Sequence, residues 1–262
     1  MAIESFGPIP SSAYTSNLSP ASSLASGTRI NQSADDPSGQ AIVSNLTTQI
    51  NTQDMASRNA NDGISLLQTA DAASQGMNDS LMRMNELAVQ AQNGTYNAQQ
   101  RAMLNQEFQQ NLETIGNIAD STNFNGLNLL NSDSASIEVA LGESNATLSL
   151  PNLTPDNLGL TGLDISNPAN ASLALQGLNL ANQQLLDSRS QFGAQQNGLT
   201  AALENIGNQN LNALSTRSQI SDTDFARAVT EQVRQSILNE SSAVMQAQNN
   251  QSRGNVLQLL GS

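Results

Sequence analysis

The stretch LNLANQQLLDSRSQFGAQQNGLTAALENIGNQNLNA, residues 178–213, carries the most regular pattern in the chain. Apolar residues recur there at every seventh position, at Leu178, Leu185, Phe192, Leu199, Ile206 and Ala213. A sustained seven-residue spacing predicts a long helix with a coiled-coil-like seam. The seam has one strong apolar column, with Ala181 and Ala202 as its best companions. We therefore expect this helix, which begins near residue 169, to pack among several helices rather than in a two-stranded coil.

Two helices are predicted before this stretch. Residues 40–92 have apolar side chains three and four positions apart, which marks an amphipathic helix. Asn93 and Gly94 should end it, because both residues tolerate the left-handed cap conformation. A second helix is expected over residues 98–120. A helix of about 50 residues is about 75 Å long at 1.5 Å per residue, so it needs partners along its length.

The segment between these helices and the long seam changes character. The run IEVALGESNATLSL alternates apolar and polar residues on both sides of a Gly-Glu-Ser-Asn turn, which predicts a β-hairpin over residues 137–150. Pro151, Pro155 and Pro168 follow, and they indicate a loop-rich patch.

Both ends of the chain carry distinct signals. A last helix is predicted from SDTD, residues 221–224, where Ser221 can cap and Asp224 follows three residues later. Its apolar face comprises Phe225, Val229, Val233 and Ile237. Residues 1–21 hold Pro8, Pro10 and Pro20 and are predicted to be irregular. A proline inside a helix costs about 3 kcal/mol, so we expect no continuous helix before about Pro20.

The composition excludes several classes of function. The chain has 262 residues, a net charge of −13, and neither Cys, His, Lys nor Trp. Phosphate-backbone binding needs a basic patch, so no nucleic-acid partner is expected. The commonest general base, the Schiff-base amine and the thiolate are all missing, so we expect no enzyme, no cofactor and no metal site. No apolar run approaches 18 residues and no signal-peptide pattern is present, so no membrane partner is expected.

The run SADDPSG, residues 33–39, contains the paired carboxylates of Asp35 and Asp36. A cation site or an acid pair is one interpretation. The favoured interpretation is a turn and helix start, because a carboxylate is stabilised at the positive end of a helix.

Several long runs, in a fixed order, resemble bacterial flagellin. The resemblance covers about 22–130 and about 170–262, and it rests on the following runs: SSLASGTRINQSADDPSGQAI (22–42), ASRNANDGISLLQTADAA (56–73), LMRMNELAVQAQNGT (81–95), FNGLNLL (124–130) and DTDFARAVTEQVRQSILNESSAVMQAQNNQSRGNVLQLL (222–260).

The resemblance implies a mostly α fold: an elongated helical bundle or coiled-coil rod with one β-hairpin, flanked by terminal helices that form an inner tube domain. The expected domains are an irregular N-terminal inner-tube segment over 1–39, a rod over 40–220 and a C-terminal inner-tube helix over 221–262. Only about 40 residues join the rod helices, so the chain is similar to short flagellins without outer domains.

The resemblance also implies a function: a structural subunit that polymerises into the bacterial flagellar filament for motility. The implied partners are further copies of the chain, a flagellin export chaperone, the filament cap and junction proteins, and Toll-like receptor 5. The implied route is type III export, so the expected location is secreted and extracellular, and innate immune recognition is implied.

The run LMRMNELAVQAQNGT, residues 81–95, has two interpretations. By spacing alone it is a solvated helix face, in which Arg83 and Glu86 form an ordinary pair worth a few tenths of a kcal/mol. Leu81, Met84, Ala88 and Ala91 are expected to face the bundle, and Leu87 is expected to project partly elsewhere. The resemblance instead implies a receptor and subunit contact at Arg83, Leu87 and Glu107. It likewise implies that the 225–237 face binds other subunits or the chaperone.

Other hypotheses stay open from the sequence. The closest is a hook–filament junction protein of the same superfamily, whose start can also read DDP, or a minor or specialised flagellin with a shortened, proline-containing N-terminus. An enzyme and a secreted disordered or coiled-coil interaction protein are the rivals from other classes.

Overall fold

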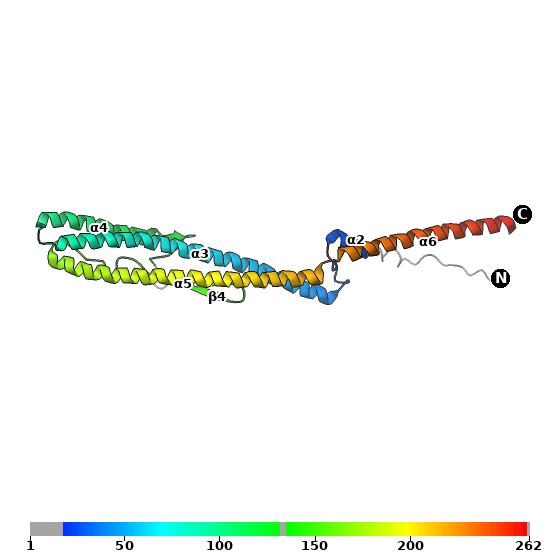
Figure 1. The fold of residues 1–262 in the computed structure, drawn as a ribbon, viewed down its shortest axis with the longest axis horizontal. Coiled ribbons are helices and arrows are strands. Elements are labelled where there is room, and N and C mark those ends of the chain that lie inside the picture. The colour runs from blue at the N-terminus through cyan, green and yellow to red at the C-terminus, as the bar shows by residue number, and fades with distance from the viewer. Residues whose placement is uncertain (1–17, 132–134, 261–262) are drawn as a thin grey trace. The chain divides into compact units, whose positions relative to one another are not determined.

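A computed structural model describes residues 18–131 and 135–260, and long helices make up most of them (Figure 1). The predicted irregularity of residues 1–17 lies outside the described residues. The elements in chain order are α2 (Leu18–Ser26), α3 (Pro37–Gln92), α4 (Ala98–Ser121), β1 (Asn123–Phe124), β2 (Leu127–Asn128), β3 (Ala135–Ala140), β4 (Asn145–Leu150), α5 (Pro168–Ser221) and α6 (Phe225–Leu260). The mostly α fold with long helices is confirmed.

The chain divides into two compact units, which we describe separately. The central unit comprises residues 51–210, and the terminal unit comprises 1–50 together with 211–262. These divisions fall inside α3 and α5. The assignment of residues 1–39, 40–220 and 221–262 to an inner tube and a rod stays a prediction.

The core of the central unit lies where α4 and α5 run alongside α3 (Figure 1). Two ion pairs mark the neighbours of α3, because Arg83 reaches Glu107 on α4 and Asp71 accepts from Arg189 on α5 at 2.8 Å. α3 supplies the largest share of the buried side chains, including Leu67, Met77, Leu81, Met84, Leu87 and Ala91. A helix covered by two others buries a wide stripe, and this explains why the apolar spacing of α3 is dense.

The seven-residue column of α5 is buried as predicted. Leu178, Leu185, Phe192, Leu199, Ile206 and Ala213 are all at most 6% exposed. Ala181 is buried beside them, whereas Ala202 is only half-buried. Ser188 completes a second column at spacings of three and four, and its hydroxyl donates to the backbone oxygen of Gln184 at 2.7 Å. The serine is tolerated in the core because its own helix satisfies its polar atom.

The predicted hairpin is present as β3 and β4, paired antiparallel from Ala135 opposite Leu150 to Ala140 opposite Asn145. Val139, Leu148 and Leu150 face the core. The hairpin approaches α3 at Gly63, where a Cβ would lie 3.2 Å from Val139 Cγ2 and 3.1 Å from Leu199 Cδ1 on α5. A glycine inside α3 therefore allows the hairpin and α5 to pack closely at the same point.

A second, smaller hairpin was not predicted. Asn123 pairs with Asn128 and Phe124 with Leu127, which leaves Asn125 and Gly126 as a two-residue loop. Both loop residues have positive φ, 51° and 80°. An Asn-Gly pair is the strongest short-range signal for such a turn. The expectation of a single hairpin is therefore corrected to two antiparallel pairs among the described residues.

In the terminal unit, α2 packs beside α6, and backbone hydrogen bonds join the segments that connect the helices. Arg29 N donates to Ser221 O at 2.6 Å, and Thr223 N donates to Gly27 O at 3.1 Å. Thr28 and Asp222 form an isolated antiparallel β-bridge. α2 begins at Leu18, so the predicted irregularity of residues 1–39 is wrong for residues 18–26. Pro20 lies within α2.

The start of α3 depends on an aspartate. Asp36 Oδ1 accepts from Gly39 N at 2.9 Å and from Ser38 Oγ at 2.9 Å, and Pro37 then occupies the first position of α3. The interpretation of residues 33–39 as a turn and helix start is thus supported.

The predicted capping role of Ser221 is wrong. Ser221 is the last residue of α5, and Asp224 Oδ1 accepts from Arg227 N at 3.2 Å before α6 begins at Phe225. Asp224 was the better candidate, because a cap residue stands immediately before the first helical residue.

Candidate assembly surfaces

The predicted apolar face of α6 is mostly exposed. Phe225 is 62% exposed, Val233 51% and Ile237 57%, whereas Val229 is half-buried. Leu238, Val244 and Met245 are exposed further along the same helix. Most stability of a helix comes from packing its apolar face, and a long exposed apolar surface marks an interaction site. The arrangement therefore offers a surface for another helix or another subunit.

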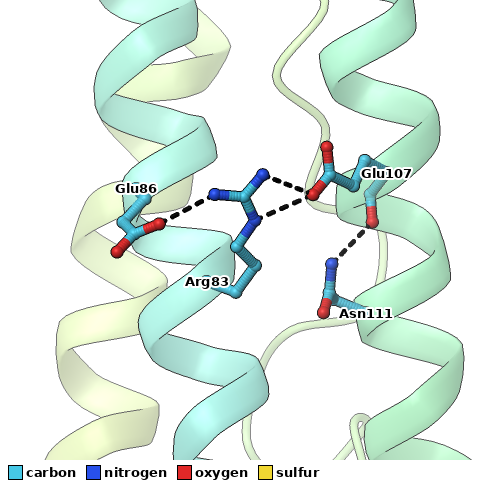
Figure 2. Close-up of polar contacts among 4 residues, drawn as sticks. All are labelled: Arg83, Glu86, Glu107 and Asn111. Carbon is cyan, nitrogen blue, oxygen red and sulfur yellow. Dashed lines mark hydrogen bonds and ion pairs between the residues drawn. The ribbon is translucent and has the colours of Figure 1, made fainter.

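The side chains of Arg83, Glu86 and Glu107 form an exposed charged cluster between α3 and α4 (Figure 2). Arg83 Nε and Nη2 donate to Glu107 Oε1 at 2.8 and 2.6 Å, and Nη1 donates to Glu86 Oε2 at 2.9 Å. Asn111 Nδ2 donates to the backbone oxygen of Glu107 at 2.9 Å. The hydrogen bond to Glu107, then that to Glu86, raises the pKa of Arg83 above its ordinary value.

This cluster holds the guanidinium in one orientation at the surface. The three side chains are 43 to 63% exposed, so the pairs contribute little to stability. A planar guanidinium held in place loses little conformational freedom when it meets a partner. Arg83 and Glu107, predicted as contact residues from separate helices, are thus adjacent, and their contact role stays a prediction.

Leu87 does not belong to that surface. Its side chain is fully buried beside those of Met84, Ala88 and Ala91. The prediction that Leu87 projects partly away from the bundle is wrong, because α4 and α5 together cover a wider stripe of α3 than a single partner would. The predicted inward direction of Leu81, Met84, Ala88 and Ala91 is confirmed.

Other residues supply the apolar surface that Leu87 does not. Met82 is 59% exposed and Val89 54%, and both line a groove of about 510 Å³ between α3 and α5. The remaining lining residues are Leu81, Asn85, Glu86, Gln90, Leu178 and Asn182. Met82 and Val89 were missed, although a signal existed: they lie seven positions apart and outside the buried stripe.

Two further features are absent from the part of the chain that the structure describes. Within residues 18–131 and 135–260, no three His, Cys, Asp or Glu side chains gather in a way that could hold a metal ion. In that same part of the chain, no helix has the length and apolar character needed to cross a membrane.

Two family models match most of the chain. Residues 15–135 match the bacterial flagellin N-terminal helical region, and residues 175–260 match the bacterial flagellin C-terminal helical region. The unmatched residues between them, 136–174, include most of β3, all of β4 and the loop that leads to α5. The matches therefore cover helices of both compact units.

Curated relatives are similar over nearly the whole length. A flagellin of Halalkalibacterium halodurans is 40% identical over 242 residues, which is 90% of this chain and 89% of that flagellin. The flagellar filament 30.7 kDa core protein of Treponema maltophilum is 33% identical, with 90% of each chain covered.

Solved structures agree with the sequence relatives. The Bacillus cereus flagellin crystal structure has a TM-score of 0.53 and 35% identity, and covers 57% of this chain and 88% of that chain. A Vibrio parahaemolyticus structure assigned as a flagellar hook-associated protein has a TM-score of 0.63 with 14% identity, covering 72% of this chain and 100% of that one. At that identity the second likeness concerns the fold alone. Identity to filament proteins over nearly the full length distinguishes a flagellin from a hook-associated protein. This chain belongs to the bacterial flagellin family and is a structural subunit of the flagellar filament.

Proposed function

We propose that the terminal unit joins neighbouring subunits through α6, and that the central unit presents the Arg83 cluster and the adjoining groove to other proteins. The observation that carries the first part is the exposure of Phe225, Val233 and Ile237 in a row whose fourth member, Val229, is half-buried. Burying an apolar side chain of this size contributes about 1.5 to 3 kcal/mol, so a row of them supplies a strong drive for association.

The test compares two charge insertions on α6. Ile237→Asp places a carboxylate in the apolar row, whereas Asn239→Asp adds the same charge at another exposed position of the same helix. Sedimentation and electron microscopy after seeding should show filaments for the wild type and Asn239→Asp and none for Ile237→Asp. Deleting residues 222–262 should also leave a soluble monomer. Normal filaments from the deletion would contradict the role given to α6.

The Arg83 cluster is proposed as a contact for a receptor or a neighbouring subunit. Its support is the fixed guanidinium, which donates to Glu86; Glu86 also lines the groove together with the exposed Met82 and Val89. Arginine is a frequent binding hot spot. Arg83→Ala should weaken activation of Toll-like receptor 5 by monomer, and Asn197→Ala on α5 should not. Equal activity of the two variants would reject this part while leaving the α6 proposal intact.

The proposed life cycle follows the family. The chain is exported unfolded through the type III apparatus, with α6 held by an export chaperone, and is secreted to assemble beneath the filament cap next to the junction proteins. Before assembly the apolar side chains of α6 would otherwise face water, which is a physical reason for a chaperone on this helix. Co-purification of the wild type and Ile237→Asp with the chaperone measures this: loss of binding in the variant supports a shared surface.

A further inference from the structure

The sequence contains three Asn-Gly pairs, and the structure places each in a different backbone setting. Asn93-Gly94 lies in the loop between α3 and α4, Asn125-Gly126 forms the turn between β1 and β2, and Asn197-Gly198 lies inside α5. We propose that Asn93 is the site at which the folded protein deamidates spontaneously, and that folding protects the other two asparagines.

The reaction needs only the chain and water. The backbone nitrogen of Gly94 loses its proton to hydroxide or buffer base and attacks Cγ of Asn93; the Cγ–Nδ2 bond breaks and ammonia leaves. The five-membered succinimide that results is opened by one water molecule at either carbonyl, which leaves aspartate or isoaspartate. Nothing is oxidised or reduced, and the balance is asparagine plus water to a carboxylic acid plus ammonia.

The electrophile is polarised at Asn93. Its side-chain oxygen Oδ1 accepts from Thr95 N at 3.1 Å and from Thr95 Oγ1 at 3.1 Å. Donors aimed at an oxygen that gains negative charge stabilise the tetrahedral species formed by attack at the adjoining carbon. Among the described residues, no donor reaches the side-chain oxygen of Asn125 or of Asn197.

The same turn also favours formation of the nucleophile, which is the deprotonated backbone nitrogen of Gly94. The backbone oxygen of Asn93 accepts from Arg101 Nη2 at 3.3 Å and from Tyr96 N at 3.3 Å, and a cationic donor on this oxygen stabilises the anion left when Gly94 N loses its proton. Within the described part of the chain, Gly94 N makes no hydrogen bond of its own. Asn93, Gly94 and Thr95 are all exposed, so water and base reach the site.

The other two pairs are held in unreactive settings. Inside α5, Gly198 N belongs to the helical hydrogen-bond ladder, and ring closure would break that ladder beside buried Leu199. In the β1–β2 turn, Asn125 and Gly126 both have positive φ, and the ring would force Asn125 away from the backbone conformation that the two-residue turn needs. Leu129 and Leu130, both buried, follow β2 and oppose the opening of the turn.

The product would change the end of α3. A new carboxylate there lies at the negative end of the helix, beside the guanidinium of Arg101, which also donates from Nε to Ala91 O at 2.9 Å. Isoaspartate also lengthens the backbone between residues 93 and 94. Both changes fall at the end of the 81–95 run, but the inference does not depend on the proposed function.

The experiment ages the full chain at mildly alkaline pH, folded and in concentrated urea, and follows all three asparagines by peptide mapping in ¹⁸O-labelled water. In urea the three rates should be similar, because each asparagine precedes glycine. In the folded monomer Asn93 should convert at least as fast as in urea, while Asn125 and Asn197 should slow severalfold. Folding that slows Asn93 as much as the other two would overturn the proposal.

Variants test the chemistry. Gly94→Ala should suppress conversion at Asn93, and it is sterically tolerated because a Cβ at Gly94 meets no atom within 4 Å. Gly198→Ala, equally free of contacts, is the matched control and should leave the Asn93 rate unchanged. Arg101→Gln and Thr95→Val should each slow conversion in the folded state only. Wild-type rates in Gly94→Ala, or equal rates with and without Arg101 in the folded protein, would refute the assigned roles.

Discussion

Helices α5 and α6 are both long and both carry a regular apolar row, yet the row of α5 is buried in the monomer and the row of α6 is mostly exposed. α5 buries Phe192 completely against α3 and its neighbours, whereas α6 leaves Phe225 62% exposed. The difference is not in the pattern, because both rows have helical spacing. It lies in the number of partners that the chain itself supplies. Among the described residues, the central unit has three helical segments and two hairpins, whereas the terminal unit packs the short helix α2 beside α6.

This contrast teaches how a subunit can be stable alone and still polymerise. The central unit closes its core within one chain, so its stability does not wait for assembly. The terminal unit leaves apolar side chains of α6 exposed in the monomer, and association with other subunits would bury them.

The sharpest test exchanges one phenylalanine in each helix for alanine. Phe192→Ala should lower the free energy of unfolding of the monomer by about 3 to 5 kcal/mol, the usual range for a buried Phe. Phe225→Ala should leave monomer unfolding in urea nearly unchanged and instead raise the critical concentration for polymerisation. If the two variants destabilised the monomer equally, α6 would be packed in solution and the contrast would fail.

A second pair applies the same logic within α3. Leu87→Ala should destabilise the monomer by about 2 to 5 kcal/mol, because the side chain is fully buried and a cavity would remain. Val89→Ala, at a position 54% exposed, should change stability little and act only on partner binding. Urea unfolding of both variants, measured before any receptor or assembly assay, separates lost folding from lost contact. A Leu87→Ala monomer as stable as the wild type would indicate that the core opens at this point.

Two glycines distinguish close packing from open surface along the central helices. Gly63→Ala should cost about 1 to 3 kcal/mol, because the new methyl group meets Val139 and Leu199 at close range. Gly193→Ala on α5 meets no atom within 4 Å and should stabilise the monomer by about 0.5 to 1 kcal/mol. Thermal unfolding of the two variants should therefore shift in opposite directions, and shifts of the same sign would mean that the hairpin does not press on α3.

The smallest expected effect concerns acid stability, with one aspartate in each unit. Hydrogen bonds from Gly39 N and then Ser38 lower the pKa of Asp36, and those from Asn170 and then Ser166 lower the pKa of Asp164. A carboxyl whose folded pKa is below its unfolded value adds stability above the unfolded pKa, and this contribution is lost as pH falls through the folded pKa. Asp36→Asn and Asp164→Asn should each flatten the loss of stability below about pH 4. Unchanged acid profiles in both variants would show that neither carboxylate is held in the folded state.

The elements whose signals are local were predictable. The bounds of α3, α4 and α5, the seven-residue column of α5 and the 137–150 hairpin follow from spacing, caps and turns that neighbouring residues supply. The small β1–β2 hairpin was also within reach, because Asn125-Gly126 is a strong turn signal. The cap of α6 is Asp224 and not Ser221, because α5 continues as far as Ser221. The spacing of apolar residues locates the end of a helix only to within a few residues.

The candidate surfaces were less predictable, and the residues show why. Arg83 and Glu107 lie 24 positions apart, and nothing in their local sequence says that α4 folds back to join them. Whether an apolar residue of α3 is buried depends on how many elements pack against that helix. Leu87 is buried because two helices cover α3, whereas Met82 and Val89 stay exposed because no further element in the described part of the chain covers their side.

By itself, the sequence determined where the long helices lie to within a few residues, which side of each is apolar and which protein family the chain resembles. It did so because helix formation, capping and amphipathic spacing are interactions over a few residues. Only the tertiary structure decided which apolar rows are covered, since burial depends on what another part of the chain brings to the same place. That is the physical reason why Leu87 and Phe192 lie in the core while Phe225, Val233 and Ile237 face outward.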